Sequence, residues 1–408
     1  MALVPLAEAI SYVVDNCSPL DPVSLGLDDA LGCVLAQDVV ATEAVPPWAN
    51  SAMDGYGVVS ADVVSASPQS PVTLEVVDTV LAGHPAEVEM GPSQAVRIMT
   101  GAPIPPGADC VVIVEKTVGS PDSSHVEVLA GVEVGANIRE AGSDIAPGEV
   151  VCHESTLLRP MHLGVLASVG VRKPMVRRRP VVGVISTGDE LIDDDRPLAP
   201  GQIRESNRPM LVALARYYGF DAVDLGTVPD DEQAISAALV DAAKRCDAVV
   251  TSGGVSMGDV DLVRVVLDSL ADMRWMKLAI RPAKPFAFGV LGETPVFGLP
   301  GNPVSAMVSF SLLAVPGLRR LAGRQDLALP RLKAVAGQDI SRRTDGRVAY
   351  IRACAEWSDG RLVVTPVSRQ GSYQLASSSA ADVLIEVPDG DGVSEGDELT
   401  AILLGFAR

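Results

Sequence analysis

The sequence has few basic residues for its length. Its 32 Lys and Arg stand against 52 Asp and Glu, which gives a formal net charge of -20. Proteins that bind nucleic acid or anionic membranes hold phosphates with Lys and Arg, so this balance argues against both kinds of partner. The sequence also lacks any run of 18 apolar residues, so we expect no membrane-spanning segment. The stretch from Met1 to Val14 has no basic start and carries Glu8, which is not the pattern of a signal peptide.

Cysteine and histidine are scarce and scattered. The chain has six Cys and four His, with no C-x-x-C motif and no two His four residues apart. Such spacing favours reduced, buried thiols and a cytoplasmic location over a disulfide framework. It also argues against a structural zinc site, whose ligands usually come in closely spaced pairs.

The acidic residues that are present concentrate in the first part of the chain. Residues 1–175 hold 6 Lys and Arg against 22 Asp and Glu, whereas residues 176–325 hold 17 against 18. Most carboxylates of the first part are expected to form a solvated surface. The nearly neutral second part is the better place for an anionic small molecule, because binding depends on the local field and not on the net charge.

The hydrophobic pattern changes along the chain. Short Val-rich runs between turn residues predict a mostly β lobe. After Arg177-Arg178-Arg179-Pro180, strand-like and helical runs alternate, which predicts a three-layer α/β domain with a largely parallel sheet. The last part lacks long helical patterns and predicts a small β domain. The predicted units are a helical and β linking domain of residues 1–45 and 141–175, the β lobe 46–140, the α/β domain 176–327 and the C-terminal β domain 328–408.

Three loops rich in small and polar residues each follow a predicted strand of the α/β domain. They are Ser186–Leu191, Thr251–Asp261 and Gly298–Pro303. In open α/β sheets ligands bind beyond the carboxyl ends of the strands. The pair Gly253-Gly254 permits positive φ and a concave run of N–H donors, a nest suited to phosphate. Each loop could equally be a plain turn whose Thr, Asp or Asn caps the next helix.

The segment between the second and third loops is cationic. Lys277, Arg281 and Lys284 lie within eight residues, and Pro282 and Pro285 exclude a helix there. A stiff, extended, cationic segment beside two anion-friendly loops suits a small polyanionic ligand. Asp259 and Asp261 at the edge of the glycine loop would repel such a ligand unless a cation such as Mg²⁺ lay between them.

Eight segments, in order along the chain, together resemble the molybdopterin molybdenumtransferase family, the MoeA-like proteins that include the E domain of gephyrin. The segments are PPWANSAMDGYG, MTGAPIPPGAD, NIREAGSDI, STGDEL, GQIRESN, SGGVSMGDVD, KLAIRPAKPFAFG and FGLPGNPVSA. Any one of these segments would be weak evidence for the family, but eight of them in the family's order are specific evidence. One departure is Arg281, which stands where the family commonly has Lys and brings a planar fork of donors in place of an ammonium.

The resemblance implies an enzyme that inserts molybdenum from molybdate into adenylylated molybdopterin, with Mg²⁺-dependent release of AMP. It also implies an elongated, multidomain chain in a homodimer, in which the α/β domain of one subunit forms the site with the β lobe of the other. The molybdopterin adenylyltransferase is a further partner that the resemblance suggests.

The resemblance also implies positions for the site residues. The catalytic positions fall on Asp54, Thr100, Asp144, Glu190, Asp261, Lys277 and Arg281. Implied substrate-binding positions fall on Asp230, Arg352 and Ser372. The three loops and the cationic segment add the candidate substrate-binding residues Ser186, Thr187, Ser252, Gly253, Gly254, Ser256, Lys284, Pro300 and Asn302. Asp261 and Glu190 are the implied Mg²⁺ ligands.

Three other functions are compatible with parts of the sequence. A molybdopterin adenylyltransferase shares the α/β domain and the glycine loop, although the β lobe with its SAMDGYG segment speaks against it. A nucleotide pyrophosphatase could be built on the same α/β domain. A non-catalytic scaffold of the gephyrin E-domain kind would use the acidic lobe as a docking surface.

Overall fold

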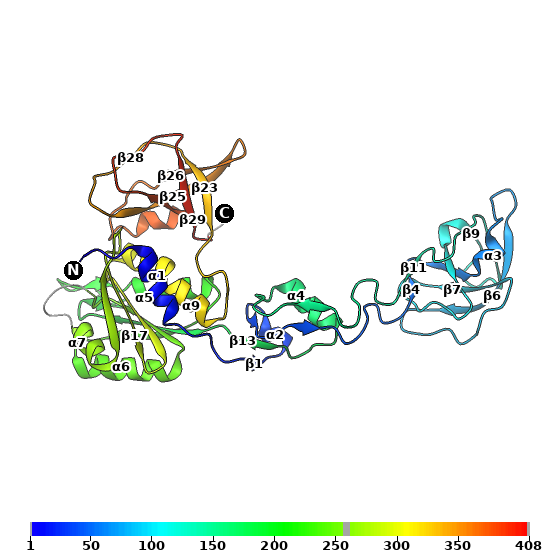
Figure 1. The fold of residues 1–408 in the computed structure, drawn as a ribbon, viewed down its shortest axis with the longest axis horizontal. Coiled ribbons are helices and arrows are strands. Elements are labelled where there is room, and N and C mark those ends of the chain that lie inside the picture. Colours follow the sequence, from blue (N-terminus) through cyan, green and yellow to red (C-terminus); the bar gives the residue numbers. More distant parts are fainter. Residues whose placement is uncertain (1, 256–261, 406–408) are drawn as a thin grey trace.

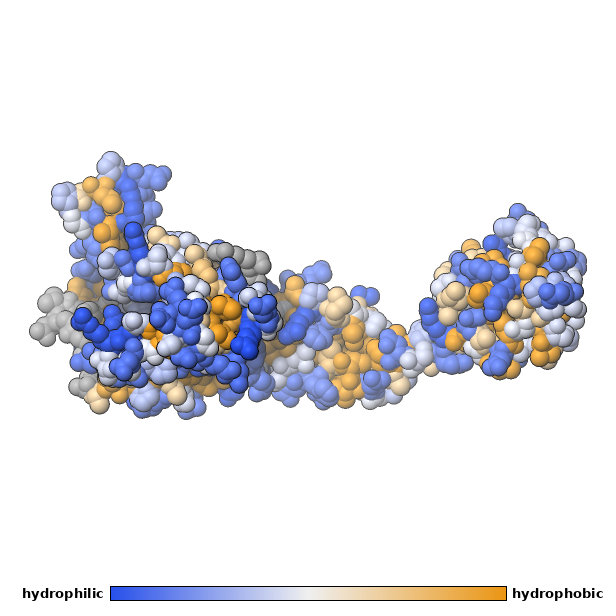
Figure 2. Space-filling view, turned by 90° about the horizontal axis from the view of Figure 1, so that it is seen from above, coloured by the Kyte–Doolittle hydropathy of each residue, from blue (hydrophilic) through white to orange (hydrophobic). Residues whose placement is uncertain are grey.

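The computed structural model describes residues 2–255 and 262–405. The chain is elongated, with a β lobe at one end, a small linking unit in the middle, and an α/β domain at the other end that carries a C-terminal β domain (Figure 1). A narrow neck separates the lobe from the linking unit, as the space-filling view also shows (Figure 2). The fold class predicted from the sequence, α/β plus β in an elongated multidomain chain, is confirmed.

The β lobe is built on a six-stranded sheet with the order β8-β5-β7-β6-β10-β9. One face of this sheet forms the core of the lobe, because successive side chains of a strand point to opposite faces. The core residues include Tyr56, Leu74, Val112 and Val126. Its elements are β4 (Asn50–Ser51), β5 (Gly55–Val58), α3 (Ser60–Val63), β6 (Val72–Val80), β7 (Gln94–Ile98), β8 (Cys110–Ile113), a 3-10 turn (Val114–Lys116), β9 (Thr117–Val118), β10 (His125–Val128) and β11 (Ile138–Arg139).

The linking unit combines two short sheets, ordered β1-β13-β2 and β12-β3, with two helices. Its own hydrophobic cluster includes Leu35, Leu158 and Leu166. Its elements are β1 (Val23–Ser24), α2 (Leu27–Ala30), β2 (Val34–Leu35), β3 (Val39–Val40), β12 (Val150–Cys152), α4 (Pro160–Ser168) and β13 (Met175–Arg177).

The first helix lies within residues 1–45, which the sequence pattern assigned to the linking domain, and it packs against the α/β domain. Helix α1 (Leu6–Asp15) packs its buried Ala9 and Val13 into the hydrophobic cluster of the α/β domain. An amphipathic pattern predicts that a helix has one buried face but does not say which neighbour covers that face.

The central domain has the sheet order β17-β14-β18-β22-β21-β19. The pairs β14–β17, β14–β18 and β18–β22 are parallel, and β21 and β19 extend the sheet in antiparallel pairings. One face packs against α1, α5, α8 and α9, and the other against α6 and α7. The predicted three layers and largely parallel sheet are therefore present.

Strands and helices alternate along the central domain, as the sequence pattern predicts. The strands are β14 (Val181–Thr187), β15 (Leu191–Ile192), β16 (Ile203–Arg204), β17 (Asp221–Val228), β18 (Ala248–Ser252), β19 (Asp272–Lys277), β20 (Ile280–Arg281), β21 (Pro285–Leu291) and β22 (Thr294–Leu299). The helices are α5 (Asn207–Tyr217), α6 (Glu232–Arg245), α7 (Leu262–Leu270), α8 (Pro303–Ser309) and α9 (Val315–Leu321).

Helices α8 and α9 form one continuous helix joined by a π turn, Phe310–Ala314. Pro316 has no backbone N–H, and its ring would meet the carbonyl one turn before it in a regular α-helix. The wider π turn accommodates this residue. The combined helix, Pro303–Leu321, has the length and apolar composition of a membrane span, but 94% of its most apolar window is buried inside the protein.

The C-terminal domain is a closed β structure. Strand β27 pairs with both β29 and β25, so the order β25-β26-β23-β29-β27 returns to its start. Strand β20 of the central domain pairs with β25 and joins the two domains. The elements are β23 (Arg331–Ala336), β24 (Ile340–Ser341), β25 (Val348–Ser358), β26 (Arg361–Pro366), a 3-10 turn (Ala376–Ala380), β27 (Val383–Val387), β28 (Gly392–Val393) and β29 (Glu398–Leu403).

The basic run that marked a boundary in the sequence connects units in the structure. Arg178 forms two hydrogen bonds to the Asp247 carboxylate, at 2.5 and 2.7 Å. The guanidinium of Arg179 donates to the carbonyl oxygen of Leu31, at 2.7 Å, and to Asp221, at 3.2 Å. These bonds connect the linking unit to the central sheet at the amino ends of β17 and β18.

All six cysteines are free thiols, and five of them are buried. Burial raises the pKa of Cys17 and of Cys110 to about 12. These thiols therefore stay protonated and unreactive at neutral pH.

Candidate functional site

The three predicted loops meet at the carboxyl edge of the central sheet. The N–H of Gly253, after β18, donates to the carbonyl of Leu299, at the end of β22, at 3.1 Å. A Cβ atom built on Gly253 would lie 3.2 Å from the carbonyl oxygen of Thr187, at the end of β14, and one on Gly301 would lie 3.8 Å from the Cα of Gly253. Parallel strands end at a common edge, which is why the loops converge there.

The glycine pair has the predicted backbone shape. Gly253 has φ of +94° and Gly254 has φ of +72°. These are left-handed values that side chains disfavour, so the turn depends on glycine. The loop is also packed tightly, because a Cβ atom on Gly254 would overlap the side chain of Val263 in α7. The predicted site residues Ser256 and Asp261, with Asp259, lie outside the described residues.

The predicted hydroxyl residues of this edge point into the protein. Ser186, Thr187 and Ser252 are all buried, and Pro300 is buried beside them. The Ser252 Oγ accepts a hydrogen bond from the Asn207 Nδ2, at 2.8 Å, whereas the Ser186 Oγ has no partner among residues 2–255 and 262–405. Asn207 was not among the residues predicted from the sequence, although it ends one of the eight family-like segments, because an Asn at a helix start is also an ordinary cap.

Exposed carboxylates flank the same edge. Asp189 and Asp230 each accept the other's backbone N–H, at 3.1 and 3.4 Å, so the loops after β14 and β17 lie side by side. Glu190 is exposed and its carboxylate lies against Gly188. Among the residues that the structure describes, no group of three His, Cys, Asp or Glu side chains could hold a metal by itself.

The predicted cationic trio spans the segment from the end of β19 to the start of β21. Lys277 and Lys284 stay together, because the N–H of Leu278 donates to the carbonyl of Lys284 at 2.7 Å. Arg281 instead lies on β20, which pairs with β25 of the C-terminal domain, and its Nη1 is 3.9 Å from the Asp345 carboxylate. Phe286 and Phe288 are buried and anchor the segment.

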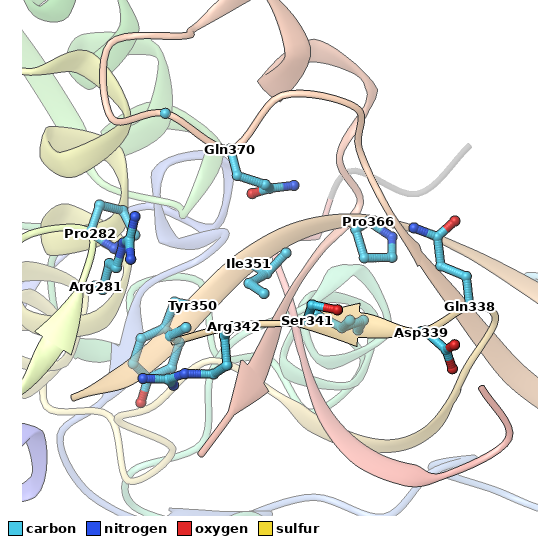
Figure 3. Close-up of a pocket in the computed structure, with 13 residues that line it drawn as sticks. Arg281, Pro282, Gln338, Asp339, Ser341, Arg342, Tyr350, Ile351, Pro366 and Gln370 are labelled. Carbon is cyan, nitrogen blue, oxygen red and sulfur yellow. The ribbon is translucent and has the colours of Figure 1, made fainter. Parts of the chain in front are cut away.

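Arg281 lies at one edge of a cavity of about 420 Å³ between the central and C-terminal domains. Figure 3 shows Arg281 on one side, Gln370 above, Tyr350 and Arg342 below, and Gln338 at the far end. The Arg342 guanidinium is bound to Asp345 and Asp389, whereas the Arg281 side chain is 64% exposed. Arg281 is therefore the more exposed of the two arginines that line this cavity.

Arg352 lies in the interior, not on the surface of the predicted site. It is 1% exposed. Its guanidinium donates to the carbonyls of Arg369, at 2.7 Å, and Gln374, at 2.8 Å, and to the Ser378 Oγ, at 2.8 Å. Arg352 thus organises the segment that contains Ser372.

Ser372 and Asn302 lie near one another at the start of α8. The Ser372 carbonyl accepts the N–H of Val304, at 3.0 Å, and so caps one of the free amides of that helix. Asn302 is exposed at the same helix end. The C-terminal domain therefore contributes directly to the loop after β22.

The predicted residues of the β lobe and its neck lie away from these loops within one chain. Asp54 accepts hydrogen bonds from the Thr100 backbone N–H, at 2.7 Å, and from its hydroxyl, at 2.8 Å. Asp144 is exposed, and its N–H donates to the carbonyl of Val45, at 3.0 Å. The lobe lies at the opposite end of the molecule from the central sheet (Figure 1).

The Asp54–Thr100 contact has a testable effect. The backbone N–H and then the hydroxyl of Thr100 lower the pKa of Asp54, because both favour its ionised form. We expect Thr100→Val to raise this pKa part of the way toward its usual value, as followed by NMR titration of the carboxyl, whereas Thr100→Ser leaves it unchanged. The stability that this contact provides is present above the usual pKa and is lost as pH falls through the lowered one. An identical titration in both variants would contradict the hydroxyl contact.

Comparisons with known proteins agree along the whole chain. Residues 4–170 match the MoeA N-terminal region (domain I and II), residues 183–320 a probable molybdopterin binding domain, and residues 333–404 the MoeA C-terminal region (domain IV). The molybdopterin molybdenumtransferase of Haemophilus influenzae is 36% identical over 402 residues, 98% of each chain. That of Bacillus subtilis is 34% identical over 404 residues, 98% of this chain and 94% of the relative.

A solved structure of the molybdopterin biosynthesis MoeA protein from Pyrococcus horikoshii has the same fold. It superposes with a TM-score of 0.82 at 30% identity and covers 100% of both chains. The similarity therefore includes the lobe, the linking unit and both domains at the candidate site.

Proposed function

Because this chain belongs to the molybdopterin molybdenumtransferase (MoeA) family, enzymes of molybdenum cofactor biosynthesis, we propose that it inserts molybdenum from molybdate into adenylylated molybdopterin and releases AMP. The observation that carries the proposal is the convergence of the loops after β14, β18 and β22. A glycine turn beside the positive end of a helix is suited to phosphate.

We place the phosphate groups of the substrate at Ser252, Gly253 and Gly254. Lys277 and Lys284 lie together at the end of β19 and the start of β21, where they neutralise substrate charge. Arg281, at the edge of the interdomain cavity, provides a charged fork for an oxyanion such as molybdate.

We also propose that the reaction uses Mg²⁺. Mg²⁺ is usually held by one or two carboxylates together with substrate phosphates. The exposed carboxylates of Glu190 and Asp230 fit this requirement, and Asp261 is a further predicted ligand outside the described residues. When bound, the ion would stabilise negative charge on the departing phosphate.

The decisive experiment is incubation of the full chain with adenylylated molybdopterin, Mg²⁺ and molybdate. We expect AMP release and metal-loaded cofactor, both dependent on molybdate. ATP-dependent adenylylation of molybdopterin without molybdate would instead identify an adenylyltransferase, and hydrolysis of free dinucleotides a pyrophosphatase. Binding of the adenylylated ligand with no AMP release would favour the scaffold function.

We further propose that the chain acts as a homodimer, with Asp54, Thr100 and Asp144 of one subunit completing the site of the other. The distance between the lobe and the central sheet within one chain supports this arrangement (Figure 1). The residues of the lobe can reach the loops only from a second copy or through a large movement of the neck.

Complementation between two variants tests the shared site. We expect Asp54→Ala and Glu190→Ala to be inactive when purified separately. Co-refolded in equal amounts, they should regain about a quarter of wild-type AMP release, because half of the dimers are mixed and each mixed dimer has one intact site. If lobe and loops of the same chain formed the site, the mixture would stay inactive.

A further inference from the structure

One buried amide connects the two loops that we assign to the phosphate groups. Asn207, the first residue of α5, is 7% exposed. Its Nδ2 donates to the Ser252 Oγ, at 2.8 Å, and to the carbonyl of Gly301, at 2.7 Å. Both protons of the amide are therefore used, one for each loop.

The two bonds fix the spacing of the anion-binding elements. Ser252 directly precedes the glycine turn, and Gly301 lies two residues before the start of α8. The loops also contact each other directly, through the Gly253 N–H and the Leu299 carbonyl. Asn207 thus links the glycine turn with the segment that leads into α8, from a third element of the domain.

Two buried polar groups at the same place have no hydrogen-bond partner within the part of the chain that the structure describes. These are the Asn207 Oδ1 and the Ser186 Oγ. Ser186 and Ser252 are register partners in the parallel pair β14–β18, so their side chains lie on the same face of the sheet. Buried polar groups are normally hydrogen-bonded, so unpartnered ones beneath a ligand loop indicate a position that is completed when the site is filled.

We infer that Asn207 is a positioning residue, which holds the glycine turn and the start of α8 at the spacing that the phosphate-bearing end of the ligand requires. The inference rests on the proposed function, because that function places the phosphates at these loops. Asn207 bonds to the protein and not to the ligand. It acts on the ligand through Ser252 and Gly301.

The test uses AMP, the expected product, as a probe in titration calorimetry on the full chain. Asn207→Ala removes both bonds and should weaken AMP binding about tenfold or more, since two hydrogen bonds to buried groups are lost. Asn207→Asp keeps the shape, but its carboxylate faces the Gly301 carbonyl and repels the phosphate, so the loss should be larger and should grow at low salt. Unchanged AMP affinity in both variants would overturn the inference.

Two further measurements separate positioning from a purely structural role. Ser311→Ala removes another buried hydroxyl on the same side of the sheet, 3.3 Å from the Tyr218 hydroxyl, and should leave AMP affinity unchanged. Asn207→Ala combined with Ser252→Ala should lose less affinity than the sum of the two single losses in binding free energy, because Asn207 acts partly through Ser252. A loss of thermal stability with normal AMP affinity, or strict additivity in the double variant, would count against positioning.

The outcome for Asn207 is distinguishable from the outcome for the proposed function. Wild-type protein that binds AMP but releases none from the adenylylated substrate would refute the molybdenum-insertion activity, while the Asn207 comparison would still stand. Wild-type protein that neither binds AMP nor releases it would overturn both.

Discussion

Gly254→Ala lowers molybdate-dependent AMP release about 100-fold or more, which is the size of effect expected when a binding group is misplaced by about 1 Å. Gly254 has φ of +72°, where an added Cβ costs about 1–2 kcal/mol. The new methyl group would also overlap Val263, which is 2% exposed in the cluster under α7. Because Val263 cannot move without α7, the glycine turn must shift.

Gly219→Ala is the matched control. Gly219 has φ of +88° and follows α5, but no atom of the described residues lies within 4 Å of a Cβ built there. This variant should lose about 1 kcal/mol of stability, from backbone strain alone. Its AMP release should match that of the wild type when both are assayed well below their unfolding temperatures. Equal activity in the Gly254 and Gly219 variants would exclude a special role for the glycine turn.

Arg352→Ala destabilises the C-terminal domain by roughly 3–5 kcal/mol and also lowers AMP release. The substitution leaves the carbonyls of Arg369, Gly371 and Gln374 without the guanidinium that donates to them. The segment that holds the Ser372 carbonyl against the start of α8 is then free to move. Hydrogen exchange of residues 369–378 and urea unfolding measure the two effects.

Two variants sharpen this result. Arg352→Lys keeps the charge but replaces the planar fork with a single ammonium, so it should recover only part of the stability. Arg361→Ala, at an exposed position of the same domain, should change stability by less than about 0.5 kcal/mol. If Arg352→Ala unfolded like the wild type, the guanidinium would not be the organising contact of this segment.

The sequence predicts the central sheet well because its signals are local. Buried parallel strands such as Val181–Thr187 and Ala248–Ser252 are continuous Val-rich runs, and their carboxyl ends must meet at one edge. The pattern of these runs is therefore enough to group the residues at that edge, from Ser186 to Gly254.

Contacts between distant segments carry no such local signal. The apolar face of α1 specifies no partner, and it is covered by the central domain. The pairing of β20 with β25 places Arg281 beside the C-terminal domain, and nothing within the cationic segment encodes that pairing. Arg352 and Asn207 form their bonds to segments far along the chain, so their roles depend on tertiary packing.

The β lobe is inserted into the rest of the chain at the neck, where its two ends lie side by side. Val45 and Ile145, the residues at its two ends, exchange backbone hydrogen bonds of 2.8 and 3.0 Å in an isolated bridge. Units whose ends are adjacent tolerate excision, insertion and permutation well. A short linker could therefore rejoin the chain across the neck and leave the other three units with their own cores intact. The lobe could be exchanged between relatives in the same way. Such chimaeras would show which subunit's lobe completes a given site.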